Sequence, residues 1–221
     1  MARRAPDSRV PLRGGPSFNR RARAQPVRQL ALIVCEDEKT EPNYFRALCT
    51  HLHINTAAVR IPPNTRGSAP ISVVEFAAEK FETDGGYDFT FCVFDKDAHE
   101  SYDRAIRVAE VYGARALDPI PLRVITSVPC FEFWLLLHFE PATRPMRRCA
   151  EVIARLRRHL PRYEKGADNI FEVLLPRTDI ALRNARLVRT QQAAAGADNP
   201  LTNVDRLVIQ LQALANANAA P

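Results

Sequence analysis

The feature that most constrains the fold of this sequence is an alternation of short apolar runs with segments of helical spacing. Apolar-rich runs of strand length occur at residues 30–35, 57–61, 87–94 and 121–128. Between them, hydrophobic residues recur at intervals of three and four, the spacing of a helix packed on one face. Strands that alternate with helices predict a parallel sheet joined by right-handed crossovers.

Local start signals place helices between these runs. We expect Thr40 to be the N-cap of the first helix, with Glu41 in its first turn. Ser68 opens the second helix, and a third is predicted from about residue 99 to 112. Beyond Pro129 the pattern is helical. It begins with an apolar segment at 130–139 and continues with predicted helices at about 146–160, 178–195 and 203–214.

These patterns predict one α/β domain over residues 28–215, Rossmann-like in outline. Its core is a mostly parallel sheet of about four strands within residues 28–128, flanked by helices. Residues 129–215 form a helical part that packs on or beside the sheet. Residues 1–27 are rich in Arg, Pro, Gly and Ser, so we predict that they form a disordered basic arm.

Composition and charge narrow the class of protein. The chain is 46% hydrophobic and 25% charged, as ordinary soluble domains are. It contains no run of 18 apolar residues, the length needed to span a membrane. The net charge is +6, and all but four of the 31 basic residues are Arg. This fits a polyanionic partner, but a GC-rich genome explains it equally well. No apolar signal segment follows Arg3 and Arg4, so we expect a cytoplasmic protein.

The five cysteines, at positions 35, 49, 92, 130 and 149, are scattered and mostly lie in apolar stretches. No CxxC pair occurs among them. The sequence therefore predicts neither a zinc ribbon nor a disulfide framework, and a reducing compartment fits best.

Acidic clusters follow two of the predicted strands, CEDE after the first and DKD after the third. Because the carboxyl ends of parallel strands share one edge of a sheet, we expect Glu36 to converge with Asp95 and Asp97. Carboxylates so close repel one another without a cation, and hard oxygen ligands select Mg²⁺ or Mn²⁺. The sequence thus predicts a divalent-metal site suited to phosphodiester chemistry. The alternative is a plain loop in which Asp97 caps the next helix.

Further candidate site residues lie near the same edge. Lys39, in the turn before the first helix, either binds a phosphate or balances neighbouring acids. Glu132 is surrounded by the apolar stretch PCFEFWLLLHFE, so it needs a metal or an internal partner. His138, in the same stretch, is interpreted as a semi-buried, hydrogen-bonded histidine rather than a catalyst.

Several arginines are candidates for contacts with nucleic acid. Arg66 lies in the loop NTRGS, where a plain turn is the alternative explanation. Arg155 and Arg158 belong to a basic helix that is either a solvated face or a track for nucleic acid.

Three segments, LIVCEDEKTEPNYFRAL, VFDKD and SVPCFEFWLLLHFE, strongly resemble in this order the RloB-like proteins, whose core resembles the TOPRIM fold. The resemblance covers roughly residues 28–215 and takes in YEKG at 163–166 and the terminal NPLTNVDRLVIQL. TOPRIM domains carry a Glu after the first strand and a DxD after the third, which hold Mg²⁺ for phosphodiester chemistry. The resemblance implies that Glu36 is a metal ligand or general base, and that Asp95 and Asp97 bind the metal.

The same resemblance implies a function and partners. RloB-like proteins are presumed nuclease effectors of prokaryotic antiphage defence, encoded near restriction loci or beside an AAA-type ATPase of the ABC class. We therefore expect a metal-dependent nuclease that acts on RNA or DNA with such an ATPase. Its expected catalytic residues are Glu36, Lys39, Asp95, Asp97 and Glu132, with Lys39, Arg66, Arg155 and Arg158 on the nucleic acid. No GxxxxGK[ST] loop occurs, so an ATPase step would need another chain.

One position departs from the family's pattern. The first motif usually reads Glu-Gly, whereas Asp37 follows Glu36 here. Glycine would permit a positive φ or a close approach of phosphate. Aspartate tolerates the left-handed region better than most residues, but it adds negative charge.

Two other functions remain open. A phosphoacceptor receiver domain also has acids after its first strand and an Asp after its third, with a hydroxyl after its fourth, here Thr126 or Ser127. The lysine that usually follows a fifth strand in receivers is missing, because Lys165 is the only lysine after Pro129 and lies in no strand-like run. A non-catalytic binding or regulatory module would use the acids for a structural metal or for none.

Overall fold

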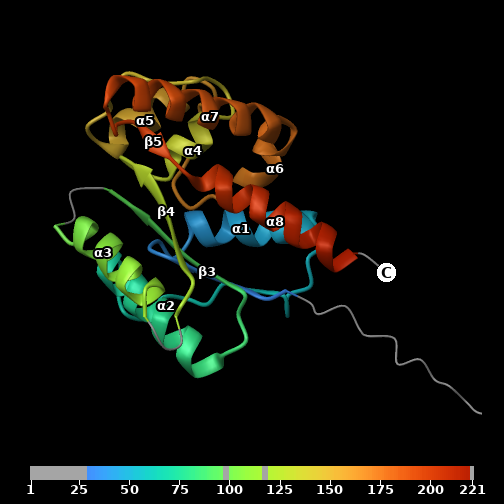
Figure 1. The fold of residues 1–221 in the computed structure, drawn as a ribbon. Coiled ribbons are helices and arrows are strands. Elements are labelled where there is room, and N and C mark those ends of the chain that lie inside the picture. Colours follow the sequence, from blue (N-terminus) through green and yellow to red (C-terminus); the bar gives the residue numbers. More distant parts are fainter. Residues whose placement is uncertain (1–28, 97–99, 116–118, 220–221) are drawn as a thin grey trace, which may run out of the picture.

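The computed structural model describes residues 29–96, 100–115 and 119–219, and a five-stranded sheet lies at the centre of this part (Figure 1). The strands are β1 (Ala31–Cys35), β2 (Val59–Arg60), β3 (Phe89–Asp95), β4 (Leu122–Val128) and β5 (Leu201–Thr202), in the order β2-β1-β3-β4-β5. The first four run parallel, which confirms the predicted α/β class and mostly parallel sheet. The fifth pairs antiparallel with β4, and its two residues are too few to produce a strand pattern in the sequence.

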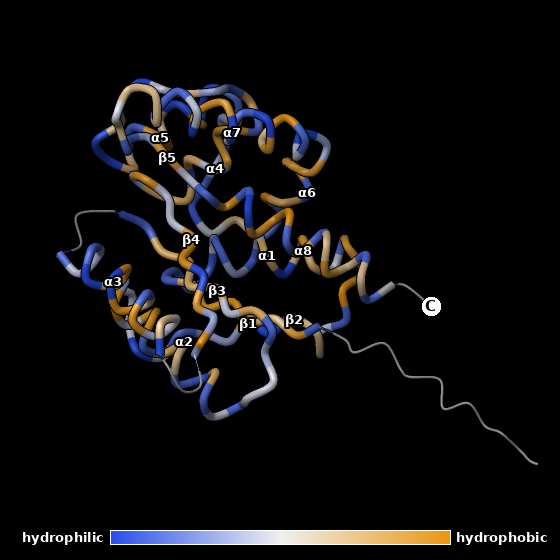
Figure 2. Tube along the Cα trace, in the orientation of Figure 1, coloured by the Kyte–Doolittle hydropathy of each residue, from blue (hydrophilic) through white to orange (hydrophobic). Residues whose placement is uncertain are grey.

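Helices cover both faces of the sheet, because the side chains of each central strand alternate between two apolar clusters. Ile33 and Phe91 belong to one cluster, and Leu32 and Cys92 belong to the other. The first face is covered by α1 (Thr40–His51) and α8 (Val204–Ala219), and the second by α2 (Pro70–Asp84) and α3 (Tyr102–Gly113) (Figure 1). In Figure 2, hydrophobic colour runs along the strands between these helix layers.

The second half of the chain is mainly helical and shares the first apolar cluster. It contains α4 (Glu132–Leu136), α5 (Cys149–Leu156), α6 (Ile170–Leu174), the 3₁₀ helix η1 (Leu175–Arg177) and α7 (Thr178–Ala195). Trp134, Phe171 and Val188 join the cluster that also holds residues of β1 and α1. The predicted helix at 178–195 is confirmed, whereas the five residues of α6 are too few to show a helical period. None of the described helices combines the length and apolar character that crossing a membrane requires.

The prediction that Thr40 is the N-cap of α1 was wrong. The helix begins at Thr40 itself, and Lys39 occupies the N-cap position without a side-chain cap bond among the described residues. Instead, Asp37 accepts a hydrogen bond from the backbone N–H of Lys39 (3.2 Å). The polar turn before the helix is therefore built by the aspartate, and Thr40 is buried.

The cysteine pattern predicted no disulfide framework, whereas in the structure Cys130 and Cys149 form one disulfide. The two residues are separated by 19 positions, with one in the turn after β4 and the other at the start of α5. Only the tertiary fold brings these segments together, so spacing in the sequence gives no signal. Cys35, Cys49 and Cys92 are free thiols.

Asn203 joins the outer part of β4 to the segment that enters α8. Its Oδ1 accepts a hydrogen bond from the backbone N–H of Thr126 (2.5 Å), and its Nδ2 donates to the carbonyl of Val124 (3.2 Å). The backbone N–H of Asn203 also donates to the carbonyl of Thr126 (3.1 Å). Asn203 thus supplies hydrogen bonds to β4 that a neighbouring strand would otherwise make.

We predict that Asn203→Ala lowers the free energy of unfolding by about 1–3 kcal/mol, because two backbone groups of β4 lose their partners. Urea denaturation followed by circular dichroism measures the change. Asn216→Ala, an exposed position on α8, should change the value by less than about 0.5 kcal/mol. Equal losses in the two variants would show that Asn203 does not supply this pairing.

Candidate functional site

The structure brings Glu36 and Asp95 together at the carboxyl ends of β1 and β3. The paired register ends with Cys35 opposite Val93, and the backbone N–H of Glu36 continues it by donating to the carbonyl of Val93 (2.9 Å). The Glu36 side chain reaches β3, where its Oε2 accepts a hydrogen bond from the backbone N–H of Asp95 (2.8 Å). The expected convergence of these two acids is therefore present.

The turn after β4 joins the two acids from a third segment. The backbone N–H of Phe131 donates a hydrogen bond to Oδ2 of Asp95 (3.0 Å). Phe131 itself is buried in the first apolar cluster. A main-chain donor anchored in the core therefore orients the Asp95 carboxylate.

These acids line a pocket at the carboxyl edge of the sheet. Its lining residues are Glu36, Asp37, Glu41, Ser68, Asp95, Phe131 and Lys165. Four of them are carboxylates, and Lys165 is the one cation of this described lining. Glu41 was expected only as a first-turn acid of α1, but it is buried, and its Oε2 accepts a long hydrogen bond from the backbone N–H of Asp37 (3.4 Å).

Crowding of the carboxylates changes their affinity for protons. Burial raises the pKa of Glu41 well above its ordinary value, and the charges of Asp95 and Glu36 raise it further. Burial also raises the pKa of Asp95 strongly, aided by the charges of Glu36 and Glu132 and opposed by the Phe131 N–H. Without a compensating cation, such acids retain their protons. Crowded carboxylates with raised pKa values are also found where acids bind a metal ion.

Lys165 supplies positive charge to the pocket. Burial lowers its pKa, but the charges of Glu132, Asp37, Asp95 and Glu41 outweigh burial and raise the pKa above the ordinary value. Its Nζ lies 3.8 Å from Oδ2 of Asp37, and about half of its side chain is exposed. A protonated amine therefore faces both the acids and the solvent.

The segment that carries Lys165 is fitted closely against the start of α1. Gly166 has a φ of +80°, and a Cβ at this position would lie 3.3 Å from the Cβ of Lys39. The backbone conformation therefore favours glycine, and a side chain here would also press against Lys39. Asn43 of α1 donates a hydrogen bond to Asp168 (2.7 Å), which fixes the other side of the segment.

Glu132, which was expected to be a fourth acid of the site, lies behind the pocket. It is 0% exposed and does not line the pocket. The hydroxyl of Tyr163 donates a hydrogen bond to its Oε1 (3.2 Å), and Sγ of Cys149 lies 3.1 Å from its Oε2. Its charge nevertheless acts on the pKa values of Asp95 and Lys165.

Two other candidates near the pocket do not line it. Lys39 is exposed, and its aliphatic stem packs against Gly166. Arg66 forms an ion pair with Glu79 of α2 (2.5 Å), although Ser68 of the same loop does line the pocket. Asp97 lies outside the described residues.

The arginines predicted to follow a nucleic acid lie elsewhere on the surface. Arg155 pairs with Glu140 (2.5 Å), and Arg158 is exposed on the turn after α5. Both line a separate hollow that also contains Arg144. They remain candidates for contacts with a nucleic acid beyond the acidic pocket.

Asp37 does not strain the turn that follows β1, where the resemblance noted in the sequence led us to expect glycine. Among the described residues other than glycine, only His53 has a positive φ, so Asp37 takes a conformation that any residue can adopt. Its Oδ1 accepts the hydrogen bond from Lys39, and its Oδ2 faces Lys165. The added charge is therefore partly balanced within the pocket.

The last strand of the sheet differs from the one expected in a receiver domain. The fifth strand, β5, is antiparallel and consists of Leu201 and Thr202, without the expected lysine. Ser127 is buried, and its hydroxyl is hydrogen-bonded to the hydroxyl of Thr202 (3.0 Å). It is therefore not a hydroxyl that opens toward an acceptor aspartate.

His138 belongs to the core, in line with its interpretation as a hydrogen-bonded histidine. It is fully buried, its Nδ1 lies 3.1 Å from the carbonyl oxygen of Trp134, and its ring packs against Trp134 and Tyr44. Burial lowers its pKa to about 4, so the imidazole is neutral at physiological pH.

Together, the fold and the pocket define an α/β protein that gathers four carboxylates and a lysine at the carboxyl edge of a mostly parallel sheet. The family model described as RloB-like protein matches residues 31–211, and the chain belongs to this family. The match extends from β1 into α8 and contains every residue that lines the pocket. No curated protein and no solved structure matches the chain.

We predict that His138 makes the folded protein less stable as the pH falls. Its pKa of about 4 in the folded chain lies below the ordinary 6.5, so the unfolded chain binds more protons between these values. Its contribution is fully present above pH 6.5 and is lost as the pH falls toward 4. The loss amounts to roughly 2–3 kcal/mol at pH 4.5.

Unfolding free energies of the wild type, His138→Gln and His51→Gln at pH 7.5 and 4.5 provide the measurement. The wild type should lose roughly 2–3 kcal/mol relative to His138→Gln. The raised pKa values of Asp95 and Glu41 give the opposite dependence of stability on pH. Both proteins contain these carboxyls, so their effect cancels when the two proteins are compared. The exposed His51 is the control, and an equal effect of both substitutions would contradict the assignment.

Proposed function

We propose that this protein is a divalent-metal-dependent nuclease that hydrolyses phosphodiester bonds of RNA or DNA. The observation that carries the proposal is the hydrogen bond from the Asp95 N–H to Glu36, because it joins acids from neighbouring strand ends at one pocket. A polyanionic substrate approaches such a pocket only when a cation compensates the carboxylates. The combination therefore favours metal-assisted phosphodiester chemistry over binding of a neutral ligand.

The donor set of the pocket fits Mg²⁺ or Mn²⁺. Apart from Lys165, the charged groups of the described lining are carboxylates, and the lining contains neither thiol nor imidazole. Glu36 and Asp95 would hold the ion, together with Asp97 as the TOPRIM-like pattern implies. When bound, the metal would stabilise charge on the attacked phosphate and activate a water molecule.

The chain's own groups have distinct roles in this proposal. Glu36 is a metal ligand or the general base, and the Phe131 N–H keeps the Asp95 carboxylate in one orientation. Lys165 binds a substrate phosphate, which is the role expected from the sequence for Lys39. Glu132 is a positioning residue that acts through Tyr163 on the segment of Lys165.

Membership of the RloB-like family supports a role as the effector of a prokaryotic antiphage system that includes an AAA/ABC-type ATPase. The sequence has no GxxxxGK[ST] loop, so ATP hydrolysis would take place on the partner chain. In this arrangement the ATPase controls when nucleic acid reaches the acidic pocket, and the present chain supplies the hydrolytic groups.

We predict that saturating Mn²⁺ raises the melting temperature of the wild type by about 5–10 °C, because it binds the folded pocket only. Asp95→Asn should abolish this rise. In metal-free buffer it should melt above the wild type, because one buried carboxylate of a repelling group is gone. Scanning fluorimetry with EDTA, Mg²⁺ and Mn²⁺ measures both effects. Asp103→Asn, an exposed position on α3, should keep the full response, and a rise that survives in Asp95→Asn would place the metal elsewhere.

We predict that Glu36→Gln and Asp95→Asn each lower cleavage by about 100-fold or more, because each change removes a charge that holds or activates the reacting groups. Lys165→Ala should lower it by about 10–100-fold. The assay uses total tRNA, single-stranded DNA and duplex DNA with Mn²⁺, with and without the ATPase partner. Asp103→Asn is the matched control. Metal binding without cleavage of any of these substrates would identify a regulatory module instead.

A further inference from the structure

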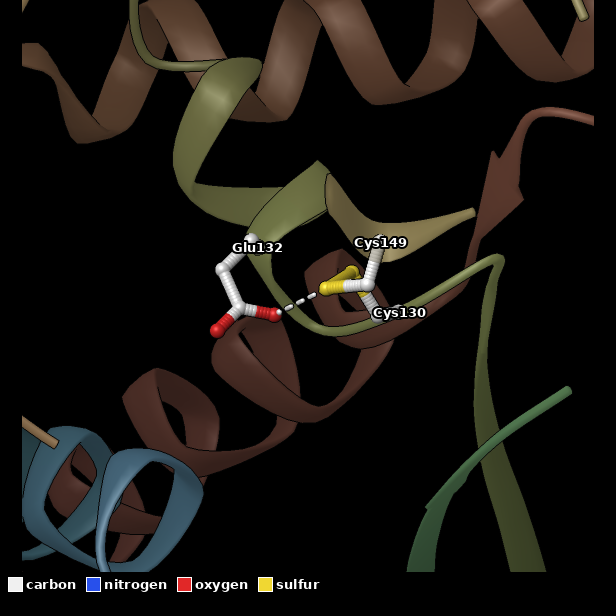
Figure 3. Close-up of side chains that lie close together, drawn as sticks. All are labelled: Cys130, Glu132 and Cys149. Carbon is white, nitrogen blue, oxygen red and sulfur yellow. Dashed lines mark hydrogen bonds between the residues drawn. A yellow bond between two sulfur atoms is a disulfide. The ribbon is translucent and has the colours of Figure 1, made fainter. Parts of the chain in front are cut away.

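Figure 3 shows a second group of reactive side chains, Cys130, Glu132 and Cys149, two of which flank Phe131 of the pocket lining in the sequence. One ligand atom of each residue lies within 4.8 Å of the others. The two sulfur atoms form a disulfide, and Sγ of Cys149 lies 3.1 Å from Oε2 of Glu132. The proposed hydrolysis does not use these sulfur atoms, so their position beside a buried acid needs a separate explanation.

The contact between sulfur and carboxylate depends on the oxidation state of the cysteines. A Cys149 thiol has a hydrogen that it can donate to Glu132, whereas a disulfide sulfur has none. In the dithiol form Cys149, whose sulfur lies 3.1 Å from Oε2, would donate to Glu132 in addition to the hydrogen bond from Tyr163 that the structure shows. In the disulfide form the Cys149 donor is lost. Because Glu132 is fully buried, water cannot replace the lost donor. The loss therefore costs the carboxylate more free energy than it would at the surface.

Both sides of this cysteine–glutamate cluster are connected to the pocket. Cys130 immediately precedes Phe131, whose N–H orients Asp95. Tyr163, which is bonded to Glu132, lies two residues before Lys165, the cation of the pocket. A change at the sulfur atoms therefore reaches the acid on one side and the cation on the other through very few residues.

The two cysteines differ in their access to solvent. Cys149 is partly exposed at the first position of α5 and follows the exposed Arg147 and Arg148. Cys130 is only 2% exposed. A small disulfide reagent can therefore reach Cys149 first, and Cys130 is placed to resolve the product.

We propose that Cys130 and Cys149 are a reversible thiol–disulfide pair that determines how firmly Glu132 and the segment of Lys165 are held. Reduction strengthens this hold and oxidation weakens it. The consequence for catalysis, a slower reaction in the oxidised form, rests on the proposed nuclease function. The structural response does not depend on that function.

The exchange with glutathione disulfide balances without a further reactant. The Cys149 thiolate attacks one sulfur of glutathione disulfide, forms a mixed disulfide and releases one glutathione thiolate. The Cys130 thiolate then attacks the Cys149 sulfur, forms the protein disulfide and releases the second glutathione. Two electrons pass from the cysteine sulfurs to glutathione, and the two thiol protons end on the two glutathione thiols.

Hydrogen exchange of the full chain, measured by mass spectrometry in defined mixtures of reduced and oxidised glutathione, tests the proposal. We expect peptides covering residues 160–168 to exchange about tenfold faster in the oxidised protein, because the Glu132 anchor of Tyr163 is weakened. The loss of about two daltons from the linked Cys130 and Cys149 peptides reports the oxidation state.

Two variants of one residue separate the hydrogen bond from the covalent link. Neither Cys149→Ser nor Cys149→Ala can form the disulfide, but only the serine retains a donor for Glu132. The serine variant should exchange like the reduced wild type, and the alanine variant about tenfold faster. Neither should respond to glutathione. Cys49→Ser removes a partly exposed thiol of α1 and should keep the wild-type response.

Three results would overturn the proposal. These are equal exchange in the two oxidation states, a disulfide that persists in excess reduced glutathione, and zinc that the reduced wild type retains but Cys149→Ser loses. The last result would make the cluster a static metal site. Since exchange is measured without substrate, a protein that lacks nuclease activity still tests the pair.

Discussion

Two main-chain hydrogen bonds hold the acidic pocket together, one from Asp95 to the carboxylate of Glu36 and one from Phe131 to the carboxylate of Asp95. Both donors are backbone N–H groups: Asp95 is the last residue of β3, and Phe131 lies in the turn that follows β4. The end of β3 and the turn after β4 therefore each supply a main-chain donor that orients one acid. The same arrangement concentrates buried negative charge at one edge, which explains why the pKa values of Asp95 and Glu41 rise.

The helical half of the chain balances the charge that the sheet concentrates. Lys165 comes from the segment between α5 and α6, and Tyr163 of the same segment binds Glu132. The apolar cluster that runs from β1 and α1 through α4 to α8 fixes this half against the sheet. The acids and their cation thus come from opposite halves of the sequence. One continuous core fixes their positions relative to each other.

The parts of this structure that the sequence predicted depend on short-range patterns. The apolar run at 30–35 and the acids that follow it predict a strand end, and parallel pairing then predicts that Glu36 and Asp95 converge. The place of Lys165 depends instead on contacts such as the one from Asn43 to Asp168, which spans 125 positions and leaves no periodic signal. The disulfide, the contacts of Glu132 with Tyr163 and Cys149, and the two-residue β5 were missed for the same reason.

Gly166 and Lys39 show how a residue beside the pocket can be retained for its shape. A Cβ at this glycine would lie only 3.3 Å from the Cβ of Lys39, and its φ of +80° disfavours every other residue. A substitution at position 166 would therefore strain the backbone even if the side chain at position 39 were shortened. The methylene groups of Lys39 thus pack against the segment that carries Lys165, so this side chain contributes packing beside the pocket as well as charge.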